Sequence, residues 1–450
     1  MTRNYRSHPE KIILVGYITI ILVGTLFLTL PVSVTDNNPI SFIDALFTST
    51  SAVCVTGLIV RDTELAFTGF GQSIILMLLQ LGGLGYMTIS TALLLLIGKN
   101  MTSETKQQTQ NEYQRFTARD IKSFVIRIIQ FTFIVEAIGS VILFPRMLAV
   151  VGSTGKAVWY SVFHSVSAFC NAGFSVFSNN LLPFMNDPYV NIVVALLIVV
   201  GGLGFVVLGD IFRNINHKRK WLSVHTKIVL ITTLVLIVVP FIIFLFLERN
   251  NSLMELSLMN KMSTAFFQII TPRTAGFNTL DIPALSMPAL FLIMMLMFIG
   301  GSPGSTAGGI KTTTFFTVIY AIFEKMRGKK NVNVMFRKIS NETILKSFFI
   351  FTLSVMVIFS GIFFLTILEK GSFLKIMFEV FSAYGTVGLS TGSVSGENIS
   401  FAGDFTSWGK FIIIVIMFTG RVGILTAANA FISKSNKDTV NYPDTKIIVG

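Results

Sequence analysis

Charged residues are scarce in this chain. Asp, Glu, Lys and Arg make up only 13% of its 450 residues, against about 25% in a soluble protein. Hydrophobic residues make up 52%, and the mean hydropathy is +0.73. This composition excludes an ordinary soluble domain and indicates an integral membrane protein. The net charge of +13 does not indicate nucleic-acid binding, because the basic residues lie between apolar runs and not on one face of a domain.

Cysteine and histidine are also rare. The two cysteines, Cys54 and Cys170, form no cluster with histidine, so the sequence supports neither a disulfide framework nor a structural metal site. A membrane enzyme or electron carrier would need buried His, Asp or Cys groups, which are nearly absent from the apolar runs. The sequence contains no recognisable triad or paired-carboxylate motif. We therefore predict that the protein is not an enzyme.

Long apolar runs recur along the chain, and each is long enough to cross a bilayer as a helix with its backbone groups bonded internally. They cover residues 12–31, 72–98, 120–144, 189–212, 224–247, 288–323, 343–368 and 408–432. No small-residue cleavage site follows the first run, which we interpret as a transmembrane helix and not a removed signal.

Between the two runs of each pair lies a shorter, half-apolar stretch. These stretches are about 12 to 14 residues long, too short to span a bilayer but long enough for a re-entrant helix. They cover residues 40–53, 156–169, 258–270 and 373–384.

Each short stretch is followed by a similar glycine-bearing segment. The four segments read SAVCVTGL (Ser51 to Leu58), SAFCNAGF (Ser167 to Phe174), ITPRTAGF (Ile270 to Phe277) and SAYGTVGL (Ser382 to Leu389). Their glycines are 116, 103 and 112 residues apart, a period far too long for a solenoid. A hydrophobic chain that repeats such a loop four times can arrange the loops around one axis, as an ion pore requires.

The predicted fold class is therefore an all-α polytopic membrane protein. It has four tandem repeats of first span (M1), pore helix and second span (M2), with pseudo-fourfold symmetry like that of a K+ channel. The predicted repeats are residues 1–98, 99–212, 213–323 with an intramembrane gate loop, and 324–432, and a cytoplasmic C-terminal tail follows at 433–450. The second spans also share small residues, which let helix backbones approach closely or bend. They contain GGLGYM, GGLGFV, GGSPGS and TGRVGI.

The distribution of Lys and Arg predicts the topology. With the N-terminus inside, 23 of these residues face the cytoplasm and 9 face outward. The positive-inside rule then places both termini in the cytoplasm and the glycine loops on the outer side. Acidic residues such as Asp62 and Asp281 would there concentrate cations near the outer mouth.

Backbone carbonyls can replace the water shell of a monovalent cation without a formal charge that would hold the ion too tightly. Aiming successive carbonyls inward needs backbone angles that glycine tolerates cheaply, and the C-terminal dipole ends of the short helices would favour the cation. We predict that the filter is lined by three residues of each loop. These are Val55, Thr56 and Gly57; Asn171, Ala172 and Gly173; Thr274, Ala275 and Gly276; and Thr386, Val387 and Gly388.

The repeated architecture, the loops CVTGL, CNAGF, RTAGF and GTVGL, and the later GSPGSTAGGIKT resemble the Trk/Ktr/HKT superfamily of potassium transporters. The resemblance covers roughly residues 10–432, with no additional helix pair ahead of the first repeat, so the chain is most similar to the KtrB type of membrane subunit. Relatives that prefer sodium carry Ser at the first filter position, where this chain has Gly57, which favours potassium. Each loop has one glycine and not the two of a K+ channel filter, so fewer ion sites are expected.

The resemblance implies potassium uptake across the bacterial plasma membrane, in many members stimulated by sodium. It also implies a homodimer with one pore per subunit and a cytoplasmic, nucleotide-binding RCK ring (KtrA-like) as partner. K+ would be the transported ion and would bind at the filter only. Na+ would be a further ion ligand. No nucleotide would bind this chain. The basic segments NHKRK (Asn216 to Lys220) and EKMRGKK (Glu324 to Lys330) would serve topology, anionic lipid or the regulatory ring, which the sequence does not separate.

Residues 300–314 read GGSPGSTAGGIKTTT in the middle of an apolar span and cannot form a straight helix. We interpret the segment as a mobile loop that obstructs the pore below the filter, where the family places its gating loop; the alternative is a fixed helix break. The predicted gate comprises Gly300, Gly301, Ser302, Pro303, Gly304, Ser305, Thr306, Ala307, Gly308, Gly309, Lys311 and Arg421. A Walker A loop is rejected because Ile310 separates Gly309 from Lys311.

Three ionisable residues lie inside predicted helices. Arg421, near the centre of the last span, is predicted to project a positive charge into the pore, the alternative being a structural ion pair. Glu136 is assigned a structural or interhelical role, and His164 a hydrogen-bonded packing role. For the whole chain, the alternative to a channel-like pore is an alternating-access Na+-coupled cation symporter, against which four repeats in the same direction argue.

Overall fold

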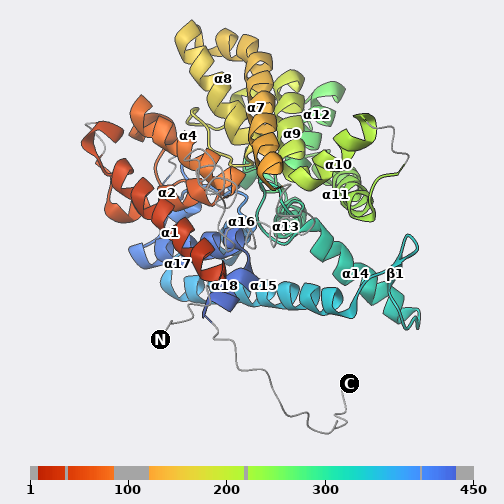
Figure 1. Cartoon of the computed structure of the whole chain (residues 1–450). Coiled ribbons are helices and arrows are strands. Elements are labelled where there is room, and N and C mark those ends of the chain that lie inside the picture. The colour runs from red at the N-terminus through yellow and green to blue at the C-terminus, as the bar shows by residue number, and fades with distance from the viewer. Residues whose placement is uncertain (1–8, 36–38, 86–120, 217–220, 396–397, 432–450) are drawn as a thin grey trace.

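The computed structural model describes residues 9–35, 39–85, 121–216, 221–395 and 398–431. The chain forms a helical bundle in which the first and last parts of the sequence lie side by side (Figure 1). The first helix of each predicted repeat is long and apolar. These helices are α1 (Pro9–Leu28), α7 (Ile121–Val151), α11 (Val224–Glu248) and α15 (Asn341–Leu368). In the described part, three helices are long and apolar enough to cross a membrane, or four if one bent pair is a single span.

The four predicted short helices are present. They are α2 (Phe42–Val53), α8 (Thr154–Phe169), α12 (Leu258–Ile270) and α16 (Phe373–Gly385). Serine begins three of them, since the side chains of Ser41, Ser257 and Ser372 accept a hydrogen bond from a first-turn N–H. Each helix also buries a phenylalanine completely. These anchors are Phe47, Phe169, Phe267 and Phe378.

The break predicted within the third segment is present, but the continuous spans predicted at 189–212 and 408–432 are wrong, since each is interrupted at one glycine. The second helices of the four segments have the following bounds. They comprise α4 (Gly69–Leu84), α9 (Pro188–Leu203) with α10 (Phe205–Asn216), α13 (Met287–Phe298) with α14 (Thr312–Met326), and α17 (Ser407–Val422) with α18 (Ile424–Phe431). The bend between α9 and α10 is 95°. In three of the four segments the helix ends at a glycine with positive φ, 80° at Gly85, 90° at Gly204 and 89° at Gly423. In the third segment α13 is followed by Ile299, which has φ of −103°. Residues 86–98 of the first repeat lie outside the described residues.

The predicted close approach of backbones at the small residues is confirmed. Gly82, Gly201 and Gly420 lie directly against the carbonyl oxygens of Val53, Phe169 and Tyr384, near the C-terminal ends of the short helices. A Cβ at any of the three glycines would clash with that oxygen. Glycine is therefore needed here to bring the second helix close to the short helix of the same segment.

The helices pack in a closed cycle. The second helix of each segment lies against the short helix of the next segment along the chain: α4 on α8, α9 on α12, α13 on α16, and α17 on α2. The last of these contacts joins the two ends of the chain. All four short helices consequently direct their C-terminal loops into the same central region.

Short connecting elements complete the fold. They are α3 (Thr63–Ala66), η1 (Pro31–Ser33), η2 (Leu182–Phe184), η3 (Ile282–Ala284), η4 (Phe401–Asp404), β1 (Asn333–Val334) and β2 (Arg337–Lys338). The two strands form an antiparallel hairpin between α14 and α15, a departure from the predicted all-α fold. Met335 and Phe336 turn the hairpin with φ of 46° and 62°. The sequence does not predict this turn, because two-residue hairpin turns usually contain glycine, asparagine or aspartate.

An ion pair supports the contact between the chain ends. The Nζ atom of Lys410, at the start of α17, lies 2.7 Å from Oδ1 of Asp44 in α2, and Arg61 binds the other carboxylate oxygen at 3.2 Å. The Lys410 side chain is only 13% exposed and the Asp44 side chain 6%. The pair is thus shielded from solvent and joins segments that are 366 residues apart.

We expect Lys410→Met to lower the free energy of unfolding by about 2–3 kcal/mol, because it leaves a buried carboxylate with one partner fewer. Arg146→Met is the matched control. Arg146 pairs with Asp187 but is 52% exposed, so its loss should cost less than about 1 kcal/mol. Unfolding midpoints in detergent measure both variants. Equal midpoints would contradict a structural role for the Lys410 pair.

Candidate pore and its filter loops

The four glycine loops share one backbone conformation. The residue two places before each glycine is left-handed, with φ of 55° at Val55, 60° at Asn171, 67° at Thr274 and 50° at Thr386. The glycines follow with φ of 91°, 68°, 74° and 95° at Gly57, Gly173, Gly276 and Gly388. Left-handed angles are uncommon outside glycine. Their recurrence at matched positions indicates that the loops perform the same task.

Hydrogen bonds from the short helices hold these loops. The backbone N–H groups of Thr56, Ala172 and Val387 donate to the carbonyls of Ser51, Ser167 and Ser382, at 2.8, 2.8 and 2.9 Å. In the third loop the corresponding residue is Thr271, which lies five residues before the glycine instead of six. There the Ala275 N–H donates to Thr271 O at 2.9 Å. The bonds offset the conformational cost of the left-handed residues.

Hydroxyl side chains at these helix ends reinforce the loops. Ser51 and Ser382 accept from the N–H groups of Gly57 and Gly388, at 3.1 and 3.0 Å. Ser167 and Thr271 instead donate to the carbonyls of Phe174 and Phe277, at 2.7 and 2.5 Å. Sequence reasoning missed these four residues as site residues. The available signal was a hydroxyl five or six places before each glycine.

The structure brings the four loops into contact as a ring. Each glycine lies against the carbonyl oxygen of the residue that precedes the next glycine, in chain order and back to the start. The pairs are Gly57 with Ala172 O, Gly173 with Ala275 O, Gly276 with Val387 O, and Gly388 with Thr56 O. A Cβ at Gly173 would lie 2.7 Å from that oxygen, and the other three would lie closer. All four predicted loops are therefore brought together at their glycines.

Three threonine hydroxyls in the loops are buried without a hydrogen-bond partner among the described residues. They are Oγ1 of Thr56, Thr274 and Thr386, and each residue is fully buried. A buried polar group without a partner costs about 1–3 kcal/mol. The cost falls if water or a hydrated cation reaches the hydroxyls. This donor set of carbonyl and hydroxyl oxygens suits a monovalent cation.

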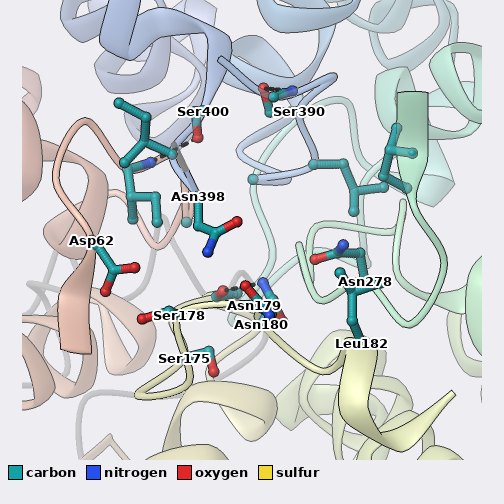
Figure 2. A pocket seen from close by; sticks show the side chains of 18 of the residues that line it. Asp62, Ser175, Ser178, Asn179, Asn180, Leu182, Asn278, Ser390, Asn398 and Ser400 are labelled. Atoms are coloured by element: carbon teal, nitrogen blue, oxygen red, sulfur yellow. Dashed lines mark hydrogen bonds between the residues drawn. The ribbon is translucent and has the colours of Figure 1, made fainter. Parts of the chain in front are cut away.

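A polar cavity of about 290 Å³ lies on one side of the ring. Its wall includes Gly57, Gly173 and Gly388 themselves. Figure 2 shows side chains from all four segments around it, among them Asp62, Asn180, Asn278 and Asn398. The cavity thus offers oxygen-bearing groups and a carboxylate to a cation at the ring.

The predicted gate segment forms a hydrogen-bonded loop between α13 and α14. Its two ends pair, with Gly300 N–H donating to Ile310 O at 2.9 Å. It also bonds to the break in the second segment, where Ser302 N–H donates to Gly202 O at 3.0 Å and Phe205 N–H donates to Gly304 O at 2.9 Å. The loop is therefore fastened at the elbow between α9 and α10.

The same loop lies against the filter loops. Gly308 packs so closely on the Thr386 hydroxyl that a Cβ would clash with it, and a Cβ at Gly300 would lie 3.3 Å from Cγ2 of Thr274. Within the loop, Ala307 N–H donates to Ser305 Oγ at 3.3 Å and Lys311 Nζ donates to Ala307 O at 2.6 Å. The predicted gate residues and two of the threonines are therefore direct neighbours.

Arg421 joins three segments of the chain at this level. Its guanidinium donates to the carbonyls of Thr306 in the loop and of Gly82 and Gly83 at the end of α4. Within the described residues its partners are carbonyls and not carboxylates, so the alternative of a structural ion pair gains no support. A charge bonded to both loop and helix end ties the loop to the first segment.

The other two ionisable residues considered from the sequence, His164 and Glu136, lie near the second filter loop. His164 is fully buried, with Nδ1 2.7 Å from Tyr160 O and Nε2 2.9 Å from Ser175 Oγ, which confirms its packing role. The Glu136 carboxylate accepts a weak bond from Cys170 Sγ at 3.8 Å, and its backbone carbonyl accepts from Ser165 Oγ at 2.7 Å. These contacts between α7 and α8 agree with the interhelical role predicted for Glu136.

Comparison with known proteins identifies the family. The sequence model of the TrkH family, described as cation transport protein, matches residues 6–441. The Ktr system potassium uptake protein B of Bacillus subtilis is 39% identical over 447 residues, which are 99% of this chain and 97% of that protein. The potassium/sodium uptake protein NtpJ of Enterococcus hirae is 36% identical over 452 residues, with 99% and 98% covered.

A solved structure shares the fold. The crystal structure of the potassium transporter TrkH from Vibrio parahaemolyticus superposes with a TM-score of 0.75 at 19% identity, covering 96% of this chain and 87% of that one. The family match and the two relatives span nearly the whole sequence. The chain therefore belongs to the TrkH family of cation transport proteins, which are transporters and not enzymes.

Proposed function

We propose that the protein is a potassium uptake pore whose selectivity filter is the ring of four glycine loops. The ring itself carries the proposal, since each filter glycine contacts a carbonyl of the next loop and the last loop contacts the first. In this reading the four repeats surround one axis with pseudo-fourfold symmetry. The names of the Bacillus subtilis and Enterococcus hirae relatives support potassium as the cargo.

Permeation follows from the groups around the ring. The polar cavity would collect cations, and its Asp62 and Asp281 carboxylates would raise their local concentration. Carbonyls of the loops would then replace the water shell, with the threonine hydroxyls as further oxygen ligands. Because the short helices end at the loops, their C-terminal dipoles would favour a cation there.

The loop of residues 299–311 and Arg421 would form the gate below the filter. The loop packs on Thr274 and Thr386, and Arg421 holds it to the end of α4. A positive charge beneath the filter would raise the barrier for a cation. Opening would then require that the Arg421 bonds to Thr306 and Gly82 break together.

Several properties of the wider assembly are proposed from the family resemblance. They are a homodimer with one pore per subunit, a cytoplasmic KtrA-like RCK ring as regulator, stimulation by sodium, and a place in the bacterial plasma membrane with both termini in the cytoplasm. The name of the Enterococcus hirae relative includes sodium. The sharp bend between α9 and α10 would also suit an alternating-access Na+-coupled symporter. Against a symporter, the contacts form one closed cycle and not two inverted halves.

Gly57→Ser tests the filter. The new Cβ would clash with Ala172 O, and φ of 91° disfavours any side chain, so we expect potassium influx to fall at least tenfold and the potassium-to-sodium ratio to fall with it. Influx of each ion is measured in a bacterium that lacks its own potassium uptake systems, with and without a Ktr-type cytoplasmic partner.

Gly155→Ser is the matched control, because Gly155 has open space around it and no left-handed backbone angle. It should retain wild-type influx. Wild-type selectivity in correctly inserted Gly57→Ser protein would rule out the proposed filter, and sodium influx without potassium influx in the wild type would change the proposed cargo.

Arg421→Met tests the gate. The variant loses the bonds to Thr306 and Gly82 and removes the charge under the filter, so potassium influx without the cytoplasmic partner should rise several-fold. Lys346→Met, which removes one exposed charge from α15, should leave influx unchanged. A folded Arg421→Met protein with equal or lower influx would show that Arg421 does not restrain the pore.

Deletion of residues 303–309 tests the loop itself. Because the deletion removes the segment proposed to obstruct the pore, potassium influx without the cytoplasmic partner should rise. A lower influx in folded protein would contradict the gate assignment.

A further inference from the structure

A second cavity, of about 790 Å³, lies away from the ring among α4, α7 and α8. Most of its lining side chains are apolar, including Met77, Phe133, Val158 and Val162. Two hydroxyls in its wall are turned to their own helices: Ser140 Oγ donates to Glu136 O at 2.8 Å and Ser161 Oγ donates to Ala157 O at 2.7 Å. Apart from Gln80 and Glu136, the wall therefore presents hydrocarbon to anything that enters.

The mouth of this cavity is open at the outer surface of the helical bundle. Val141 is 73% exposed, Met77 66%, Phe133 56% and Val158 48%, and all four line the cavity. Residues 123–151 of α7 are apolar enough to cross a membrane. Glu136 in the cavity wall is near the middle of α7, about 22 Å from either helix end at 1.5 Å per residue. At that depth the surrounding medium is the hydrocarbon core of the bilayer, which is about 30 Å thick.

We propose that this cavity is a binding site for an acyl chain of a membrane lipid. An empty apolar space of this size would lose packing contacts along its whole wall, whereas a chain from the adjoining bilayer restores them at little cost. A lipid headgroup is too polar for this depth, so the site selects the chain and not the head. The assignment rests on the cavity and its depth alone and holds whichever ion the protein carries.

The inner wall of the cavity is shared with the second glycine loop. Cys170, which caps α8 and precedes Asn171, lies 3.8 Å from both Gln80 Oε1 and Glu136 Oε1 in the wall. Val166, another wall residue, accepts the Cys170 N–H at 2.9 Å. A bound chain would therefore press on the residues that hold the loop. This coupling, unlike the binding itself, rests on the proposed filter.

Photolabelling tests the site. A phospholipid with an alkyl diazirine in the middle of one chain, which reacts preferentially with carboxyl groups, is added to the full-length protein in lipid nanodiscs and irradiated. We expect label on Glu136, which is only 4% exposed and within reach only of a chain inside the cavity. Peptide mass spectrometry locates the label, and Glu136→Gln should shift it to neighbouring wall residues.

Val158→Trp should close the mouth and reduce the label on α7 and α8 wall residues at least fivefold. Val238→Trp is the matched control, since Val238 is 43% exposed on α11 and lies outside the cavity. Labelled α11 peptides verify that both variants are inserted. Two outcomes would overturn the site. One is label on α11 but none on the cavity wall in the wild type. The other is label on the cavity wall that Val158→Trp does not reduce.

The coupling is read separately from ion influx. If the chain supports the filter loop, Val158→Trp should lower the potassium-to-sodium influx ratio at least twofold while Val238→Trp leaves it unchanged. Loss of label without a change in this ratio would overturn the coupling and leave the binding site in place.

Discussion

The close approach of backbone to backbone is the constraint on which the rest of the structure depends. At the ring, Gly57, Gly173, Gly276 and Gly388 each contact a carbonyl of the neighbouring loop, and none has room for a side chain. Around the ring, Gly82, Gly201 and Gly420 bring the second helices against the C-terminal ends of the short helices. Glycine is needed at both levels because any Cβ would push the loops apart and displace the oxygens that they present.

A second constraint is that polar groups inside a membrane protein need partners. The helices satisfy their own backbones, and the hydroxyls of Ser51, Ser167, Thr271 and Ser382 bond to backbone groups of the loops. The hydroxyls of Thr56, Thr274 and Thr386 remain without partners among the described residues. All three belong to the filter loops, and Thr274 and Thr386 also lie beside the loop of residues 299–311. In the proposed pore a cation or its water would meet them there.

Much of the site could be predicted because its signals are local and repeated. The predicted bounds of the short helices lie within a few residues of the observed ones, since a serine precedes each helix and a glycine loop follows it. The helix breaks were harder. A glycine such as Gly204 or Gly423 is equally compatible with tight packing inside a straight helix, and only the positive φ decides between them. The roles of Ser51 and Thr271 could not be predicted from the sequence either. A hydroxyl can accept a hydrogen bond from the loop, as Ser51 does, or donate one to it, as Thr271 does.

Long-range contacts were beyond sequence reasoning for a different physical reason. Arg421 can be recognised as a charge within an apolar span. Its carbonyl partners, however, lie 115 and 339 residues away in the sequence, and no periodic pattern encodes such pairs. The lateral cavity is similarly a product of how α4, α7 and α8 meet. Its wall residues are ordinary members of apolar helices and become distinctive only after packing.

The most direct test of the account is the position of a bound permeant ion. Crystals grown with rubidium in place of potassium would be examined by anomalous diffraction. The account predicts a rubidium peak inside the ring of Gly57, Gly173, Gly276 and Gly388, ligated by loop carbonyls. Rubidium bound only elsewhere, with the ring fully ordered and empty, would contradict it.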